Sequence, residues 1–375
     1  MSFAELLFIA CFVFTGYTYV GYPLIVALLA RWFPAPPVKT QLPDAKPKVA
    51  VIIPVFNGLP YLQGKLDSLR AQDYPTELLQ IVMIDDGSDD GSADFLSSQS
   101  DVTLLRVDPR QGKPNALNTA IECLDDSIEV LVLTDVRQKL SVNAVSVLVA
   151  ALGDPGVGAA SGELQLTGKD GSAAEIGLYW RYEKWIRVNE SRFSSTPGAS
   201  GALYAIRRRD FRPLRKDTLL DDFEIPTRAA AGSRRIILVP QARAYDEAEV
   251  SLGGERNRKI RTLAGWHQSL VRNHRLLLPG NPVFFQFMSH RVFRLLVPYA
   301  LAGMLLACVA AESPWMVAAG VAQLVFYAVA LAGVIFGERR NSSRIVRLAA
   351  TFLTLNLAVL AGFARFVRGS YTVKW

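Results

Sequence analysis

Four long apolar runs constrain the fold of this chain more than any other feature of its sequence. They cover about Leu6–Ala30, Val292–Ala311, Trp315–Phe336 and Ile345–Phe366. At about 1.5 Å of rise per residue, each is long enough to cross a hydrocarbon layer of about 30 Å as a helix. No Lys or Arg precedes the first run and no small-residue cleavage motif follows it, so we expect a retained anchor rather than a cleaved signal peptide.

The remainder of the chain carries most of the charge. Half of the 375 residues are hydrophobic, but 41 are Lys or Arg and 34 are Asp or Glu, for a formal net charge of +7. These values exclude a disordered or collagen-like chain and indicate membrane spans joined to a polar folded domain. The three cysteines are too scattered for a disulfide framework, and the three histidines lack the i, i+4 spacing of a helical zinc site.

We expect five consecutive parts. Residues 1–31 form an N-terminal transmembrane anchor, and residues 32–47 form a Pro-rich linker. Residues 48–250 form a catalytic domain. They are followed by an amphipathic interface helix region at residues 251–290 and by about three C-terminal transmembrane helices at residues 291–375. Arg31, Lys48 and Arg291 lie beside the spans on one side, which favours a cytoplasmic face for the central domain. Four crossings place Arg365 and Arg368 on the opposite face, against this pattern.

Residues 48–250 alternate short β-branched runs with helical patterns, which is typical of an α/β domain. The expected strands are Val49–Ile53, Leu79–Ile84, Val102–Val107, Val130–Thr134, Val157–Glu163, Ala202–Ile206 and Arg235–Val239, and the expected helices between them include Leu59–Gln72 and Pro114–Cys123. The following segment, Arg256–Arg294, is basic, contains no acid and repeats apolar residues at helical spacing. We interpret it as an amphipathic helix on an anionic membrane surface rather than as a nucleic-acid site.

Polar residues follow several of the expected strands. Phe56 and Asn57 come after the first strand, and Asp86 comes after the second. Ligands of an open parallel sheet bind at the carboxyl ends of its strands, and acidic side chains there suit the hydroxyls and amides of a nucleoside. The alternative for the second segment, Asp85–Ser88, is a simple turn.

Three further positions suit the chemistry of a diphosphate and an acceptor. Asp135 ends the fourth strand, where a carboxylate suits Mg²⁺ or Mn²⁺ shared with a diphosphate. Lys113 opens a helix whose N-terminus can receive an anion. One acid of Asp221-Asp222 could take a proton from an acceptor hydroxyl. The structural alternatives are a turn carboxylate, an exposed loop lysine and a helix N-terminal acid.

Two glycine-rich segments do not support other enzyme classes. Gly156–Ser161 lacks the third glycine of a dinucleotide-binding loop, and Gly198–Ala202 lacks the spacing of a hydrolase nucleophile elbow. The aromatic segment Tyr179–Trp185 contains Trp180 and Trp185, which could stack on an acceptor sugar, although such stripes more often belong to a core.

In their order, these motifs resemble membrane-integrated inverting glycosyltransferases of family 2, the group that contains cellulose, chitin and hyaluronan synthases and bacterial polysaccharide synthases. The matching elements are Val51–Asn57, Ile84–Ser88, Gly112–Asn118, Thr134-Asp135, Ser200–Ala202, Asp221–Phe223 and the basic helix before the C-terminal spans. The resemblance covers nearly the whole chain. It implies a GT-A nucleotide-sugar transferase domain with a mixed, mostly parallel sheet.

The resemblance also implies roles for individual residues. On the donor side, the nucleoside would contact Phe56, Asn57 and Asp86. The diphosphate would contact Lys113, Arg258 and Arg261. The resemblance makes Asp135 the ligand of Mg²⁺ or Mn²⁺ and Asp222 the general base. On the acceptor side we place Asp221, Trp180, Trp185, Ser200 and Gly201.

Two departures from the family pattern matter. Members often carry Asp-x-Asp at the metal strand, but Arg137 occupies the third place here. The processive signature Gln-x-x-Arg-Trp aligns best with Arg258–Thr262, which keeps Arg261 but lacks Gln and Trp. The arginines of this segment have a second interpretation, in which they face lipid headgroups.

We therefore expect a multi-pass glycosyltransferase of the inner or plasma membrane with a cytoplasmic catalytic domain. It would transfer one or a few sugars from a nucleotide-sugar, which we expect to be a UDP-sugar, to a lipid-linked or glycan acceptor in surface or extracellular polysaccharide biosynthesis. Membrane lipids are expected partners and nucleic acid is not. A processive polysaccharide synthase and an inactive membrane scaffold or nucleotide-sugar sensor remain as alternatives.

Overall fold

The computed structural model describes residues 1–38, 41–167, 178–232, 234–247, 252–278, 283–311, 313–336, 343–371 and 373. The chain divides into two compact units. The membrane unit consists of Met1–Trp32, Gly177–Ile186 and Ser251–Tyr371, and the sheet unit of Phe33–Ile176, Arg187–Val250 and Thr372–Trp375. The boundary that the sequence predicts between residues 250 and 251 lies outside the described ranges.

The sheet unit is built on one mixed sheet in the order β3-β2-β1-β4-β7-β6-β8-β5. Strands β1, β2, β3 and β4 run parallel to one another, while β7 is antiparallel to both β4 and β6. The strands are β1 (Lys48–Val55), β2 (Leu79–Asp85), β3 (Val102–Arg106), β4 (Ile128–Leu133), β5 (Lys139–Leu140), β6 (Val157–Thr167), β7 (Tyr204–Arg207) and β8 (Arg235–Glu247). The expected mixed, mostly parallel sheet is confirmed.

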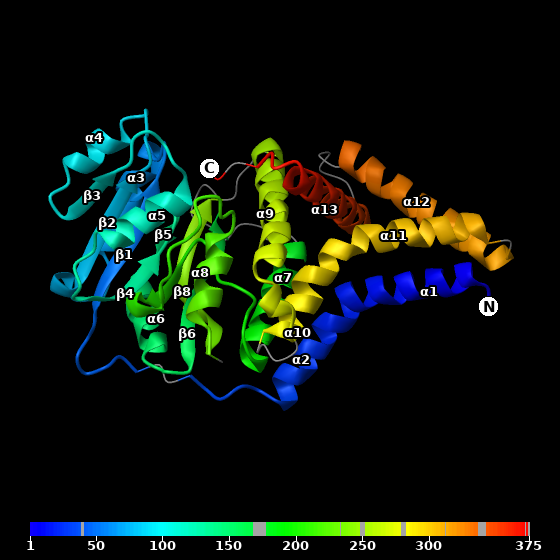
Figure 1. The fold of residues 1–375 in the computed structure, drawn as a ribbon, viewed down its shortest axis with the longest axis horizontal. Coiled ribbons are helices and arrows are strands. Elements are labelled where there is room, and N and C mark those ends of the chain that lie inside the picture. Colours follow the sequence, from blue (N-terminus) through cyan, green and yellow to red (C-terminus); the bar gives the residue numbers. More distant parts are fainter. Residues whose placement is uncertain are drawn as a thin grey trace. The chain divides into compact units, whose positions relative to one another are not determined.

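Both faces of this sheet are buried, as the run of apolar residues in β1 requires. Val51 and Ile53 belong to the core on one face, and Ala50 and Ile52 belong to the core on the other. The first core is completed by α3 (Leu59–Arg70) and α6 (Ala144–Leu152), and the second by α5 (Lys113–Glu122) and α8 (Asp221–Ala229) (Figure 1). The shorter helical segments are Thr76–Leu78, α4 (Ser92–Ser97) and Arg208–Asp210.

The membrane unit is helical. Among the described residues, four helices are long and apolar enough to cross a membrane: Phe3–Trp32, Phe284–Ala310, Pro314–Phe336 and Arg344–Val367. The first span comprises α1 (Phe3–Gly16), a π-helical turn (Tyr17–Gly21) and α2 (Tyr22–Trp32). The second span comprises α10 (Phe284–Gln286), a π-helical segment (Phe287–Val292) and α11 (Phe293–Ala310). The third and fourth spans are α12 (Pro314–Phe336) and α13 (Arg344–Val367). All four spans expected from the sequence are confirmed as helices.

The basic segment forms α9 (Leu252–Arg272), followed by a short helical turn at His274–Leu277. Within the membrane unit α9 packs along α13, α1 along α11, and α12 along α13 (Figure 1). Helices α9 and α13 approach each other closely at Gly362. A Cβ atom at this position would lie 2.8 Å from the Cβ of Leu263 and 3.0 Å from the Ala264 nitrogen. The aromatic segment lies on α7 (Leu178–Phe193), which begins in the membrane unit and ends in the sheet unit.

The glycine at position 158 permits close packing between β6 and the end of α8. A Cβ atom there would lie 2.6 Å from both the carbonyl oxygen of Ala229 and the Cα of Ala230. Because these are backbone atoms that cannot rotate away, we expect Gly158→Ala to destabilise the sheet unit by about 1–3 kcal/mol or more. Calorimetry in detergent should show a lower melting temperature.

The matched control is Gly156→Ala, two residues earlier. A Cβ atom there meets only the Oδ1 of Asp154, at 3.2 Å, and this side chain can shift. We expect the control to melt like the wild type. Equal melting temperatures for both variants would contradict the close packing at Gly158.

Candidate active site

The carboxyl ends of β1, β2 and β4 bring the residues predicted from the sequence to one edge of the sheet. Phe56 and Asn57 follow β1, Asp86 follows β2, and Asp135 comes two residues after β4 ends. The antiparallel strand β7 begins at this edge, where Tyr204 pairs with Leu133. The sheet order therefore gathers side chains that are far apart in the sequence.

Asp86 is fully buried and anchors the loop before α5. One carboxylate oxygen accepts a hydrogen bond from the backbone nitrogen of Gln111 and the other from that of Gly112, both at 2.8 Å. Gly112 has φ +96°, in the region that favours glycine, and leads into Lys113 at the start of α5. Asp86 therefore orients the helix start that carries Lys113.

Phe56 and Asn57 border this loop. The guanidinium of Arg110 stacks on the Phe56 ring, 3.3 Å from its centroid. Asn57 has a positive φ of 49°, and its side-chain oxygen accepts a hydrogen bond from the Asp89 nitrogen at 3.1 Å. Arg110 was not predicted as a site residue. The only signal for it in the sequence is its position two residues before Gly112.

Lys113 is the centre of the acidic cluster at this edge. Its ammonium lies 2.8 Å from Oδ1 of Asp135 and 3.0 Å from Oδ2 of Asp221. Burial disfavours the charged ammonium, but the carboxylates of Asp135, Asp221 and Asp222 outweigh it and raise the pKa of Lys113 above its usual value. Lys113 is therefore a permanent cation held in place by two ion pairs.

Asp222 lies against the loop Gly198–Gly201. Its backbone oxygen accepts a hydrogen bond from the Ala199 nitrogen at 2.9 Å. A Cβ atom at Gly201 would lie 3.2 Å from Oδ2 of Asp222, and the Ser200 nitrogen donates to Oγ of Ser161 at 2.9 Å. The structure thus places Ser200 and Gly201 beside Asp222, and Asp221 beside Lys113.

Two buried polar residues, Lys65 and Tyr204, lie near the cluster, and neither was singled out in the sequence. Lys65 donates to Oγ1 of Thr134 and to the Gln138 carbonyl oxygen, each at 2.7 Å, and so fixes the turn that carries Asp135. The Tyr204 hydroxyl has no hydrogen-bond partner within the described ranges. Burial raises the pKa of Tyr204 well above the usual value. The nearby carboxylates raise it further, and that of Asp221 contributes the most among them.

A divalent ion at this edge would take few ligands from the protein. In the part of the chain that the structure describes, no three His, Cys, Asp or Glu side chains form a metal-binding group. Arg137 does not face an ion but pairs with Asp246, with 3.2 Å between Nη2 and Oδ1, and Gln138 donates to the other oxygen of Asp246 at 2.7 Å. Asp135 has a partly exposed side chain, which fits an ion that takes most ligands from a diphosphate and water.

The remaining predicted site residues belong to the membrane unit. Trp180 is half-buried and Trp185 is exposed on α7, while Arg258 is exposed and Arg261 half-buried on α9. Their assigned roles at the acceptor and the diphosphate stay predictions.

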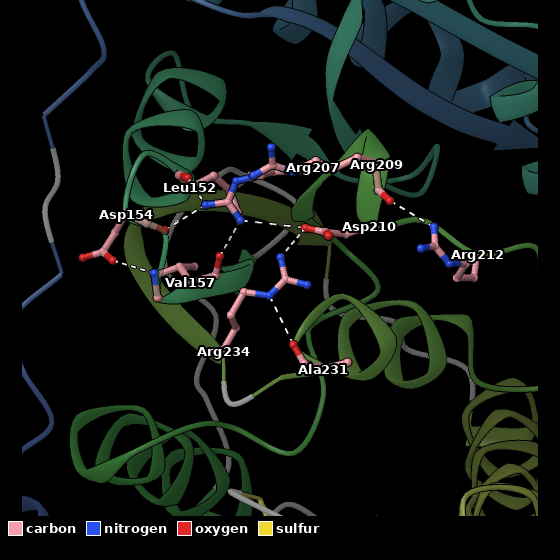
Figure 2. Close-up of polar contacts among 10 residues, drawn as sticks. Leu152, Asp154, Val157, Arg207, Arg209, Asp210, Arg212, Ala231 and Arg234 are labelled. Atoms are coloured by element: carbon pink, nitrogen blue, oxygen red, sulfur yellow. Dashed lines mark hydrogen bonds and ion pairs between the residues drawn. The ribbon is translucent and has the colours of Figure 1, made fainter.

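A cavity of about 860 Å³ in the sheet unit lies at the other end of β4, lined by Ile128 and Val130 and by a cluster of arginines. Figure 2 shows Arg207 pointing at backbone oxygens and at Asp210, and Arg212 pointing at the backbone oxygen of Arg209. Arg207 donates to the carbonyl oxygens of Leu152, at the end of α6, and of Asp154 and Val157. Because Arg207 and Arg212 already have partners and lie away from Lys113, we assign this cluster to stability.

Comparison with known proteins agrees with the geometry. The model of the glycosyl transferase family 2 matches residues 50–215. An N-acetylglucosaminyltransferase from Neorhizobium galegae is 34% identical over 158 residues, which are 40% of this chain and 35% of that protein. An N-acetylglucosaminyltransferase from Rhizobium meliloti (strain 1021) is 29% identical over 217 residues, 54% of this chain and 49% of that protein. The chain thus spans half or less of these curated relatives.

One solved structure is similar along nearly the whole chain. It is the mannosyltransferase PcManGT from Pyrobaculum calidifontis in complex with GDP-Man and Mn²⁺, with a TM-score of 0.73 and 25% sequence identity. The similarity covers 96% of this chain and 99% of that one. The glycosyltransferase family 2 domain, over residues 50–215, and the GT-A fold expected from the sequence are confirmed.

Lys65 gives the site a pH-dependent stability. Burial lowers the pKa of Lys65 to about 7, although Asp135 acts in the opposite direction. Between about pH 7 and the ordinary lysine pKa of about 10.4, the unfolded chain therefore binds more protons than the folded one. The free energy of unfolding should rise by a few kcal/mol over this range in metal-free buffer.

We expect Lys65→Met to remove this rise, as measured by melting temperatures of the two proteins at pH 7, 8 and 9. Lys139→Met, at an exposed lysine, is the control and should keep the wild-type profile. Parallel pH profiles for wild type and Lys65→Met would show that Lys65 stays charged in the folded protein.

Proposed function

We propose that this chain, a glycosyltransferase with a family 2 domain of the GT-A fold, moves one or a few sugars from a nucleotide-sugar to a lipid-linked or glycan acceptor. We propose further that the reaction inverts the anomeric carbon, takes place at the cytoplasmic face of the membrane and contributes to surface or extracellular polysaccharide biosynthesis. The observation that carries the proposal is the Lys113 ammonium between the carboxylates of Asp135 and Asp221, with Asp222 alongside.

The donor lies, in this proposal, across the carboxyl ends of β1 and β2. Phe56 and Asn57 border the nucleoside, Asp86 fixes the loop beside it, and Lys113 meets the diphosphate. A fixed cation attracts the diphosphate and stabilises the charge that develops on it as the sugar leaves. The two backbone hydrogen bonds to Asp86 support this arrangement, because they fix the start of α5 before any ligand binds.

The local charge supports a divalent ion as cofactor. Three carboxylates, of Asp135, Asp221 and Asp222, surround the one ammonium of Lys113, which leaves a charge of −2 when all are ionised. Asp135 would hold Mg²⁺ or Mn²⁺, which supplies positive charge to the departing diphosphate. The Mn²⁺ in the mannosyltransferase supports this assignment.

Asp222 is the proposed general base. It removes the proton of an acceptor hydroxyl, whose oxygen attacks the anomeric carbon on the face opposite the diphosphate. The bond from that carbon to the diphosphate oxygen breaks, the nucleoside diphosphate leaves, and the configuration inverts. The resemblance to the family gives this role to Asp222, while the carboxylate of Asp221 forms an ion pair with Lys113.

Two donors have specific support. The curated relatives are N-acetylglucosaminyltransferases, which favours a UDP-linked N-acetylhexosamine and agrees with the UDP-sugar expected from the sequence. The structure similar over the whole chain binds GDP-Man, which makes GDP-mannose the second candidate. The partly degenerate Arg258–Thr262 segment favours transfer of few sugars, and a long polymeric product would support the processive alternative instead.

The first test measures release of nucleoside diphosphate by detergent-purified protein from UDP-N-acetylglucosamine, other UDP-sugars and GDP-mannose. The assay contains Mg²⁺ or Mn²⁺ and a membrane-lipid extract as acceptor. We expect turnover of one donor that stops with EDTA and falls at least about 100-fold in Asp222→Asn. Donor binding without turnover by the wild type would favour the scaffold or sensor instead.

A second test probes the space beside Asp222. Gly201→Ala puts a Cβ atom 3.2 Å from Oδ2 of Asp222, so the carboxylate must shift by a few tenths of an ångström. We expect kcat to fall about tenfold or more with little change in the KM of the donor, since catalysis is sensitive to small misplacements.

Gly156→Ala is the matched control, because its Cβ atom also lies 3.2 Å from a carboxylate oxygen, that of Asp154, at the other end of the sheet. It should keep full activity. Unchanged kcat in Gly201→Ala would remove the support for Asp222 as the base.

A further inference from the structure

The membrane unit contains a cavity of about 340 Å³ among α9, α11 and α13 that combines charged and apolar walls. Its charged wall includes Arg258 and Lys259 of α9 and Arg291 and Arg294 from the start of the second span. Its apolar wall includes Leu295 and residues of α13. Figure 1 shows α9 beside α13, where the Gly362 contact brings the two helices together.

The charge of this cavity is strongly positive. Of the lining residues that the structure describes, four are Arg or Lys and none is acidic. Behind the wall, Glu183 of α7 forms an ion pair with Nη1 of Arg294 and contacts Nε2 of His290 at 3.2 Å. Burial disfavours the Glu183 carboxylate, but Arg294 and His290 outweigh it and hold its pKa well below the usual range. Among the residues that the structure describes at this cavity, cations therefore outnumber acids.

Several buried donors in this wall lack acceptors. Nε of Arg291, and Nε and Nη2 of Arg294, are inaccessible to solvent and have no hydrogen-bond partner in the described part of the chain. The Arg291 guanidinium faces the Trp266 ring, 4.7 Å from its centroid, which limits its freedom. These atoms do not face the cavity, but the lining that the structure describes carries four cationic side chains and no carboxylate, so a ligand with several anionic oxygens suits this wall.

The apolar wall distinguishes a lipid from a soluble anion. Leu295 lies in the candidate span Phe284–Ala310, and Leu355 and Val359 lie near the middle of the span Arg344–Val367. Basic pockets between membrane helices recognise lipid headgroups, because the cations meet the phosphate while the chains stay in hydrocarbon. A free nucleotide or inorganic phosphate has no group that would use these leucine and valine side chains.

We propose that this cavity binds the phosphate headgroup of an anionic membrane lipid, with the hydrocarbon chain along Leu295, Leu355 and Val359. The phosphate accepts hydrogen bonds from Arg291 and Arg294 and is also drawn by Arg258 and Lys259. This site is separate from the proposed transfer reaction, and lipid binding is measured without any sugar donor, so either proposal can fail alone.

Native mass spectrometry of the full chain in detergent tests the site, by titration with dioleoyl phosphatidylglycerol and with dioleoyl phosphatidylcholine. We expect the wild type to bind phosphatidylglycerol at least about fivefold more tightly than phosphatidylcholine. Arg291→Gln, which removes one cation, should lose about fivefold in affinity for phosphatidylglycerol. Leu355→Trp, which fills the cavity without changing its charge, should lose a similar factor.

Arg368→Gln is the matched control, because Arg368 is an exposed arginine at the end of α13 outside the cavity lining. It should bind like the wild type. Equal binding of both lipids by the wild type would overturn the proposal, and so would unchanged binding in both Arg291→Gln and Leu355→Trp. Displacement of the lipid by UDP, GDP or inorganic phosphate would also overturn it, because the cavity would then belong to a soluble anion. The wild-type measurements decide the matter even where a variant does not fold.

Discussion

The arrangement of the candidate active site depends on the carboxylate of Asp86. Buried at the end of β2, it would be costly without partners, and it finds them in two backbone N–H groups, those of Gln111 and Gly112. These hydrogen bonds fix a loop that only a glycine with positive φ can complete, and α5 then begins at Lys113. The position of Lys113 therefore follows from an interaction of Asp86 with the backbone.

The ion pairs of Lys113 connect this loop to residues that follow other strands. Its ammonium joins Asp135, which follows β4, to Asp221, which opens α8. Lys65 holds the Asp135 turn from beneath, and the Gly198–Gly201 loop leaves room beside Asp222. The excess of carboxylates over ammonium groups would attract a divalent ion to this edge, although Arg137 stands where the family often has a second Asp and pairs instead with Asp246.

Much of the fold was predictable, because strands buried on both faces and spans of apolar residues leave strong patterns in a sequence. The two-residue strand β5 (Lys139–Leu140) was missed, since a strand this short has no periodicity. The predicted residues at the strand ends do gather at one edge, as the parallel topology requires. Arg110, Tyr204 and Lys65 were missed because their importance arises from burial and from contacts across the fold. A lone lysine in a helical pattern gives no sign that it is buried under the Thr134–Asp135 turn.

If Asp86 acts on the donor through Lys113, the two residues should be coupled in a double-mutant cycle on nucleoside diphosphate binding. UDP and GDP affinities of wild type, Asp86→Ala, Lys113→Met and the double variant would be measured by calorimetry with Mn²⁺. The account predicts that each single change weakens binding about tenfold or more and that the double variant is no weaker than the worse single one. Losses that multiply in the double variant would contradict it, because the two residues would then act independently.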